Sequence, residues 1–186
     1  MDKLYYTGVG SRATPPHILK VMTAIAKKMA FLTFILRSGG AIGADLAFEA
    51  GATEVLYAQQ NGLIEGNLIQ PPEIFYSKDA TPEARAIAGQ FHPAWNAFRK
   101  DGSPVVSDYA KNLHGRNAFQ VLGRTLDIPS KYCICWTPDG CLSHATRTQL
   151  TGGTGTAISI ASHYGVPVVN LQNPEHLIVW EEWAYA

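Results

Sequence analysis

The sequence predicts an α/β fold, a Rossmann-like three-layer sandwich with a mostly parallel central sheet. Short apolar runs alternate with helical patterns along the chain, which is the order of elements in folds of this class. Three junctions between such a run and the helix after it are rich in glycine. The 186 residues are 46% hydrophobic and 16% charged, which supports one folded domain over residues 1–186 rather than a disordered chain.

The first repeating unit is a strand over Leu4 to Thr7, a glycine turn and a helix. Thr14 and the pair Pro15–Pro16 supply a cap and a rigid first turn for the helix. The apolar positions that follow have the spacing of a helix with one buried stripe, and lysines occupy the other side. These apolar positions are Ile18, Val21, Met22, Ile25, Met29 and Leu32.

The second unit repeats this order. Phe34 to Leu36 predicts a buried strand, a glycine turn follows, and a helix that begins near Leu46 ends at Gly51. Leu63 to Ile69 is compatible with a strand, which Pro71–Pro72 ends.

Residues 71–107 are less regular, and we expect a helical and loop insertion there, with one helical piece over Ala84 to Phe91. A clearer helix spans about Asp108 to Leu126. Lys131 to Trp136 is a continuous apolar run of the kind that central parallel strands show. A third glycine turn then precedes a helix, which is followed by a strand; the two cover Ala157 to Tyr164 and Val166 to Leu171.

Composition narrows the classes of function. Fifteen basic residues balance fifteen acidic ones, so no global positive field attracts nucleic acid. The three cysteines, Cys133, Cys135 and Cys141, are an odd set without a fourth Cys or a His at zinc spacing, and we expect reduced thiols, no metal and no cofactor. The first residues lack a signal-peptide layout and Met29 to Leu36 is too short to span a membrane, so we expect a cytoplasmic protein without a membrane partner.

The three glycine turns are the main candidates for a binding site. Loops at the carboxyl ends of parallel strands lie on one side of the sheet, and each of these turns opens a helix whose free N–H groups favour an anion. One such turn can be only a packing device, but the added Ser, Thr and Arg side chains favour phosphate. The candidate phosphate-binding residues are Gly8, Gly10, Ser11, Arg12, Ser38, Gly39, Gly40, Gly43, Gly152, Gly153, Thr154, Gly155 and Thr156.

Further candidates lie outside the glycine turns. The i, i+3 spacing places His114, Asn117 and Gln120 on one helical face, with Arg116 close to them in the chain; the group is either a set of base or sugar contacts or a solvated surface. Trp136 and Asp139 follow a central strand at its carboxyl end and are also candidates for such contacts. Asp45 either caps its helix or holds a sugar hydroxyl.

The turns resemble the signature turns of the SLOG superfamily, which includes the Rossmann-like core of the DNA-processing protein DprA (Smf) and the LOG phosphoribohydrolases. Two other segments look most like small stand-alone DprA-like proteins of bacteriophages and mobile elements. The matching segments are Thr7–Arg12, Ser38–Ala41 with Gly43–Asp45, Gly152–Thr156, Leu113–Asn117 with Gln120–Gly123, and Cys135–Gly140.

The resemblance implies a nucleotide site, with departures that bear on activity. LOG enzymes carry P-G-G-x-G-T-x-x-E, and this chain has Thr151 in place of the Pro and Ser159 in place of the Glu that serves hydrolysis. The phosphate cradle therefore matches and the carboxylate does not. Asp45 or Glu49 is left as the candidate general acid or base.

We therefore expect a DprA-like protein that binds a nucleotide or nucleotide-derived ligand. One alternative is a LOG-type phosphoribohydrolase, which cleaves the N-glycosidic bond of a nucleoside 5′-monophosphate. The other is a recombination accessory that binds single-stranded DNA, which the balanced charge disfavours. Apolar residues at Met29, Phe31 and Trp180 to Tyr185 predict a homodimer or higher homo-oligomer.

Overall fold

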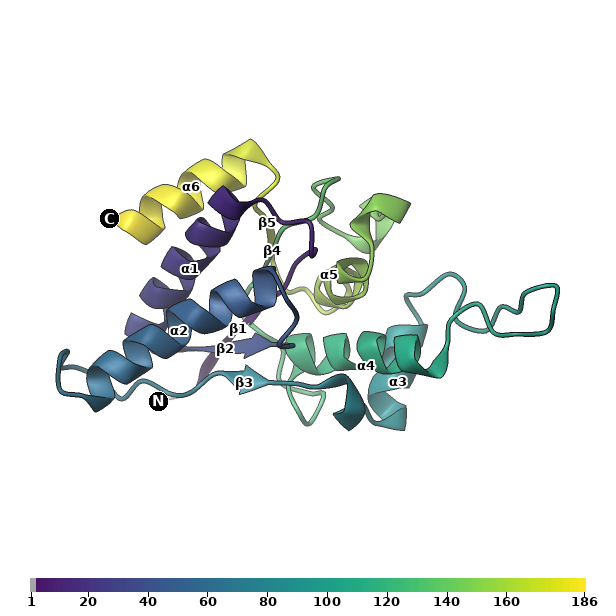
Figure 1. The fold of residues 1–186 in the computed structure, drawn as a ribbon, viewed down its shortest axis with the longest axis horizontal. Helices are drawn as coiled ribbons and strands as arrows, with labels where there is room; N and C mark the ends of the chain where they lie inside the picture. The colour runs from purple at the N-terminus through teal and green to yellow at the C-terminus, as the bar shows by residue number, and fades with distance from the viewer. Residues whose placement is uncertain (1–2) are drawn as a thin grey trace.

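The computed structural model describes residues 3–186 and contains one five-stranded sheet (Figure 1). Every strand pair is parallel, in the order β3-β2-β1-β4-β5, so the predicted α/β Rossmann-like sandwich is confirmed. The strands are β1 (Leu4–Gly8), β2 (Phe34–Ser38), β3 (Glu73–Ile74), β4 (Cys133–Cys135) and β5 (Val168–Asn170). The expectation that the first residues form no signal peptide includes Met1 and Asp2, which lie outside the described residues.

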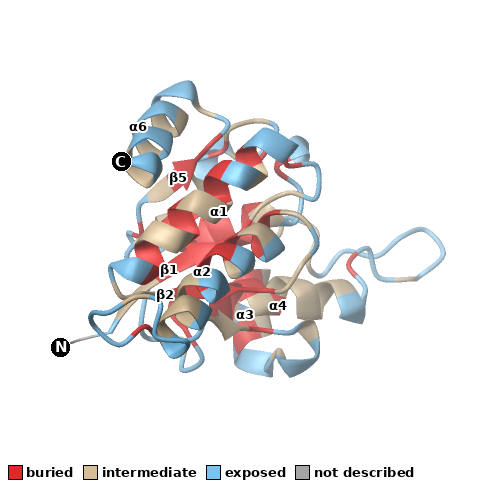
Figure 2. Ribbon diagram, turned by 60° about the vertical axis from the view of Figure 1, so that its left-hand side comes forward, coloured by how far each residue is buried: buried red, intermediate tan, exposed pale blue. Residues whose placement is uncertain are grey.

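Within residues 3–186, six α-helices form the two outer layers. One face of the sheet packs against α1 (Pro16–Phe31), α2 (Ala44–Gln60) and α6 (Pro174–Tyr185). The other packs against α4 (Asp108–Leu122) and α5 (Thr154–His163), and α3 (Pro82–Gly89) packs on α4. Short 3₁₀ helices occur at η1 (Ser77–Asp79), η2 (His144–Thr146) and η3 (Gln149–Thr151). Figure 2 shows that the buried residues lie on the sheet and on the inward sides of the helices.

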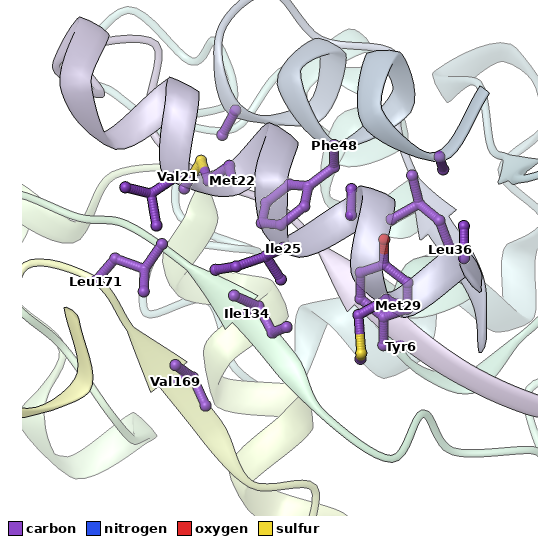
Figure 3. Packing of buried hydrophobic residues seen from close by; sticks show 14 of the residues in the cluster. Tyr6, Val21, Met22, Ile25, Met29, Leu36, Phe48, Ile134, Val169 and Leu171 are labelled. Atoms are coloured by element: carbon purple, nitrogen blue, oxygen red, sulfur yellow. The ribbon is translucent and has the colours of Figure 1, made fainter. Parts of the chain in front are cut away.

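Two hydrophobic clusters hold the layers together, and β4 contributes to both because successive side chains of a strand point to opposite faces. Ile134 lies in the cluster under α1, and Figure 3 shows it facing Ile25. Cys133 and Cys135 lie in the other cluster, against α4 and α5, as buried free thiols.

Gly51 lies inside α2 and does not end the helix as the sequence suggested. A Cβ at this position would overlap the carbonyl oxygen of Thr23 in α1 and lie 2.9 Å from Ala26 Cβ. The Thr23 hydroxyl also donates a 3.0 Å hydrogen bond to the carbonyl oxygen of Ala47 in α2. The glycine therefore serves the close approach of two helices, and α2 continues to Gln60.

Two further predicted boundaries are wrong. Leu63 to Ile69 is a loop, held to α2 by the Gln59 side chain, which donates to Asn67 O and accepts from Ile69 N. The helix expected to reach Leu126 ends at Leu122, because Gly123 adopts a positive φ of 77° against the buried Arg37.

Residues 71–107 supply the edge strand β3 and the helix α3, which packs on α4. The segment between α3 and α4 also contains an extended loop, closed by an antiparallel bridge between Phe98 and Pro104, that projects from the body of the molecule (Figure 1).

The exposed apolar residues differ in part from those that the sequence predicted for self-association. Met29 is only 2% exposed and packs in the core, so its predicted exposure is wrong, whereas Phe31 and Tyr185 are 60% and 63% exposed. Association between copies of the chain stays a prediction. Within residues 3–186, no helix combines the length and the apolar character needed to cross a membrane.

The α1–α2 contact makes a test of the fold possible. We expect Gly51→Ala to lower the free energy of unfolding by about 2 to 3 kcal/mol, because the added methyl group forces two packed helices apart. Thr53→Ala, on the exposed side of the same helix, should change it by less than about 0.5 kcal/mol. Urea unfolding followed by circular dichroism measures both; equal effects of the two variants would contradict the packing role.

Candidate functional site

A cavity of about 360 Å³ lies beyond the carboxyl ends of β1 and β4, between the glycine turns and α4. The chain runs from β1 outward through β2 to one edge of the sheet and reaches β4 on the other side of β1, so the cavity occupies the point where strand order reverses. Its lining residues are Val9, Gly10, Ser11, Arg12, Ala41, Asp45, Ala110, Leu113, His114, Arg116, Asn117, Gln120, Thr151, Gly152, Gly153 and Thr154.

The first glycine turn is clamped between the second turn and the end of β4. The Ser11 amide donates a 3.1 Å hydrogen bond to the carbonyl oxygen of Trp136. A Cβ at Gly10 would lie 2.6 Å from Ala44 Cβ, so only glycine fits there without a shift. Trp136 therefore supports the turn through its backbone, and its buried side chain does not line the cavity.

Gly8 serves packing rather than the cavity. A Cβ at this residue would lie 2.7 Å from the Phe48 ring and 2.8 Å from Leu36. Gly8 is not among the residues that line the cavity.

Two carboxylates hold the second glycine turn. Asp45 Oδ2 accepts hydrogen bonds from the amides of Gly39 (3.0 Å) and Ala41 (3.4 Å). Glu49 Oε1 accepts from the Ser38 hydroxyl (2.6 Å) and the Gly40 amide (3.0 Å). Of the acidic pair only Asp45 lines the cavity, which leaves Glu49 as a support for the turn.

Gly43 shapes the same turn from its other end. It has a φ of 101° and precedes α2 as its N-cap, where a Cβ would lie 3.5 Å from the backbone of Ser11 and Arg12. Ser38, Gly39, Gly40 and Gly43 therefore lie behind the cavity wall.

Asp45 is the one buried carboxyl group among the cavity-lining residues. It lies within the first turn of α2, after the N-cap Gly43, and is 3% exposed. Burial raises its pKa to about 6, against the lowering effects of the Arg116 charge and of the amides of Ala41 and Gly39. A carboxyl group in this state can gain or lose a proton near neutral pH.

The third glycine turn presents unoccupied amides to the cavity. Gly153 is the N-cap of α5 and no side chain caps this helix end. Within residues 3–186, the amides of Gly153 and Thr154 donate to no protein acceptor. The Asn117 side chain donates a 3.1 Å hydrogen bond to Gly153 O, which fixes the turn from α4. Free amides and the positive end of the helix dipole make this an anion-binding position.

Asp139 supports the third turn from outside the cavity. Partial burial raises its pKa, but hydrogen bonds from the hydroxyl groups of Thr148, Thr151 and Thr137 and from the Cys141 amide outweigh this and lower the pKa to about 2. The charged carboxylate orients Thr151, the residue before the glycine pair.

Gly155 and Thr156, the last two candidate residues of the third glycine turn, lie within α5 and do not line the cavity. Thr156 Oγ1 is 2.8 Å from His114 Nδ1, and Gly155 leaves room for Arg147.

Polar atoms of α4 are left without partners at the cavity. Gln120 is fully buried and lines the cavity, and neither Nε2 nor Oε1 of its side chain has a hydrogen-bond partner within residues 3–186. Arg116 donates from Nη1 to Gly39 O at 3.0 Å, while its Nε has no partner in the same range. Asn117 and Gln120 are buried and His114 and Arg116 are partly buried, and unpaired polar groups in a cavity are typical of a site that a ligand completes.

Some residues near the site were missed by sequence reasoning. Arg147 packs against Gly155 and donates to Phe91 O at 2.9 Å and to Thr156 Oγ1 at 3.4 Å. His144 Nδ1 is 2.9 Å from the hydroxyl of Ser159, which is buried and lines no part of the cavity. The only sequence signal was the Ser- and Thr-rich stretch around these residues.

No metal site is apparent in the part of the chain that the structure describes. Among residues 3–186, no three His, Cys, Asp or Glu side chains are placed to hold a metal ion. The cavity lining offers the side chains of Asp45, two arginines and a histidine, together with amides and hydroxyl groups.

The burial of Asp45 predicts that the difference in free energy of unfolding between Asp45→Asn and the parent protein depends on pH. Because its folded-state pKa is raised from 3.8 to about 6, its contribution to stability is full below about pH 4 and is lost as the pH rises through 6. Asp45→Asn should therefore gain stability relative to the parent protein over this window, by up to about 3 kcal/mol.

Urea unfolding of both proteins at four pH values from 4 to 7 measures this difference. Asp139→Asn is the contrasting variant: since the pKa of Asp139 is lowered to about 2, its difference from the parent should change only below about pH 4. A constant difference for Asp45→Asn would show that Asp45 is ionised throughout this range.

Comparisons of the chain with protein-family models, curated proteins and solved structures find no match. What the cavity binds is accordingly inferred from its own residues.

Proposed function

We propose that the cavity binds a nucleotide or a nucleotide-derived ligand. The observation that carries this proposal is the fully buried Gln120 amide, unpaired within residues 3–186, which lines the same cavity as the free amides of Gly153 and Thr154. The ligand therefore combines an anionic group with a part that both donates and accepts hydrogen bonds, as a phosphate and a base or ribose do.

The phosphate is assigned to the N-terminus of α5. The amides of Gly153 and Thr154 donate to it, and Arg12, which lines the same cavity and forms no ion pair within the described residues, supplies a positive charge. A cavity of about 360 Å³ is at the small end of the range for small-molecule sites, which suits one nucleotide-sized group.

The base or ribose is assigned to the inner part of the cavity. Gln120 offers one acceptor and two donors, and Val9 and Leu113 supply apolar contact. The resemblance of the three glycine turns to the SLOG superfamily, and of the α4 segment to small stand-alone DprA-like proteins, supports the same assignment.

A second candidate function is hydrolysis of the N-glycosidic bond of a nucleoside 5′-monophosphate. The observation that favours it is Asp45, a buried carboxyl group in the cavity whose pKa burial raises to about 6. In this reaction Asp45 accepts a proton from the attacking water or donates one to the leaving base. Glu49 is committed to the Ser38 hydroxyl and the Gly40 amide, so the role falls to Asp45 alone.

Replacement of the unpaired amide tests ligand binding. Gln120→Met keeps the size of the side chain and removes groups without a partner, so the ligand-free protein should be as stable as the parent or more stable. Affinity for the ligand should fall about ten-fold or more, since the hydrogen bonds of the amide are lost. Isothermal titration calorimetry with the nucleoside monophosphates of the four common bases and with ADP-ribose measures the affinity.

Gln60→Met, at the exposed end of α2, is the matched control and should change neither quantity. No binding by any of these compounds would overturn the proposal. Binding of short single-stranded DNA alone, with steep weakening by salt, would support the recombination-accessory alternative instead.

Turnover is tested separately by chromatography of the same mixtures. Release of free base by the parent protein and its loss in Asp45→Asn, with nucleotide affinity retained, is the outcome expected of the hydrolase. A bound nucleotide that stays intact would exclude hydrolysis of that compound and leave the binding function.

A further inference from the structure

A second cavity lies on the other side of the third glycine turn. Its volume is about 690 Å³, and it shares His114, Gly152 and Gly153 with the first cavity. The rest of its wall comes from the segment after α3 and from η2 and η3. These residues are Gln90, Phe91, His92, Pro93, His144, Arg147, Thr148 and Gln149.

The lining of this second cavity is suited to an anion. It contains one arginine, three histidines and no acidic residue. Arg147 is half-buried, and no carboxylate of the described residues lies within 4.0 Å of its guanidinium group. It donates only to neutral oxygens, those of the Phe91 carbonyl and the Thr156 hydroxyl. A partly buried cation without a counter-ion is costly, and an anionic ligand would offset that cost.

Two of the histidines, His92 and His114, have surroundings that disfavour their charged forms. Burial lowers the pKa of His114 to about 4, and the charges of His92, Arg147 and Arg116 act in the same direction. Burial and the Arg147 charge also lower the pKa of His92. At neutral pH the His114 ring is uncharged, so Arg147 supplies positive charge at the shared wall of the two cavities.

Arg147 is tied directly to the helix end assigned to the first phosphate. Its Nη2 and the Nδ1 of His114 both contact Thr156 Oγ1, at 3.4 and 2.8 Å. It also packs against Gly155, the residue after the free amide of Thr154. The guanidinium group thus lies beside Gly155 and Thr156, which directly follow the free amides of Gly153 and Thr154 in the chain.

We propose that Arg147 binds a second phosphate of the same ligand, which makes the ligand a nucleoside diphosphate or a compound that contains one. This inference rests on the proposed nucleotide-binding function. The first phosphate accepts from the amides of Gly153 and Thr154, and the second crosses the glycine turn to the guanidinium group in the second cavity.

Paired ligands test the inference. With the parent protein, we expect a nucleoside diphosphate to bind at least about ten-fold more tightly than the monophosphate of the same base, as measured by calorimetry. In Arg147→Gln this ratio should fall to about one, with the monophosphate affinity little changed. Arg85→Gln is the matched control, because Arg85 pairs with the exposed Asp108 and lines neither cavity, and it should leave the ratio unchanged.

The melting temperature of Arg147→Gln shows whether this variant folds. A second test uses only the parent protein and so does not depend on the variant. Inorganic pyrophosphate should displace a bound nucleoside monophosphate from the parent protein at a concentration about ten-fold lower than inorganic phosphate.

The outcomes separate the two proposals. If mono- and diphosphates bind the parent protein equally, or if Arg147→Gln weakens both by the same factor, the second phosphate site is overturned and nucleotide binding stands. If neither class binds, the proposed function itself fails.

Discussion

The candidate site depends on two adjacent residues of α4 that bridge two glycine turns. Arg116 donates to the Gly39 carbonyl oxygen of the second turn, and Asn117 donates to the Gly153 carbonyl oxygen of the third. Each bond uses the carbonyl group of a turn, and at the third turn the amides of Gly153 and Thr154 stay free beside the cavity. Because the two donors are consecutive on one rigid helix, the distance between the turns is set by the helix backbone rather than by the loops. The first turn is then held in place by Ser11 and the end of β4.

This arrangement separates residues that build the cavity from residues that are free to act in it. Glu49 accepts hydrogen bonds from the Ser38 hydroxyl and the Gly40 amide, and Asp139 accepts them from the Thr148 and Thr151 hydroxyls. Gln120 has no partner in the described chain, and Arg147 has no acidic one. Unsatisfied groups of this kind reduce the stability of the ligand-free protein, and such local costs are found where a protein is complementary to something it binds. The polar imbalance is thus more informative about function than the shape of the cavity alone.

Sequence reasoning predicted the fold well, and it named some of the residues that line the cavity. Periodicity and glycine position identified β1, β2, β4 and the three turns, because these features are local. The role of Gly51 was misjudged, since close approach to Thr23 of another helix leaves no local signature. The face of α4 with Gln120 was open to two interpretations until its burial was known. Arg147 was missed because it lies in an irregular segment, and only tertiary packing brings it to Gly155.

The two edge strands of the sheet, β3 and β5, affect how copies of the chain can associate. The edge strand β3 has two residues, and at the other edge the Asn170 amide of β5 is occupied by the His176 ring nitrogen of α6. Short, covered edges give an incoming strand little to pair with, which protects a protein from joining its sheets end to end. Self-association of this chain would therefore proceed through side chains on helix surfaces, such as Phe31 of α1 and Tyr185 of α6, and not through a continuous intermolecular sheet.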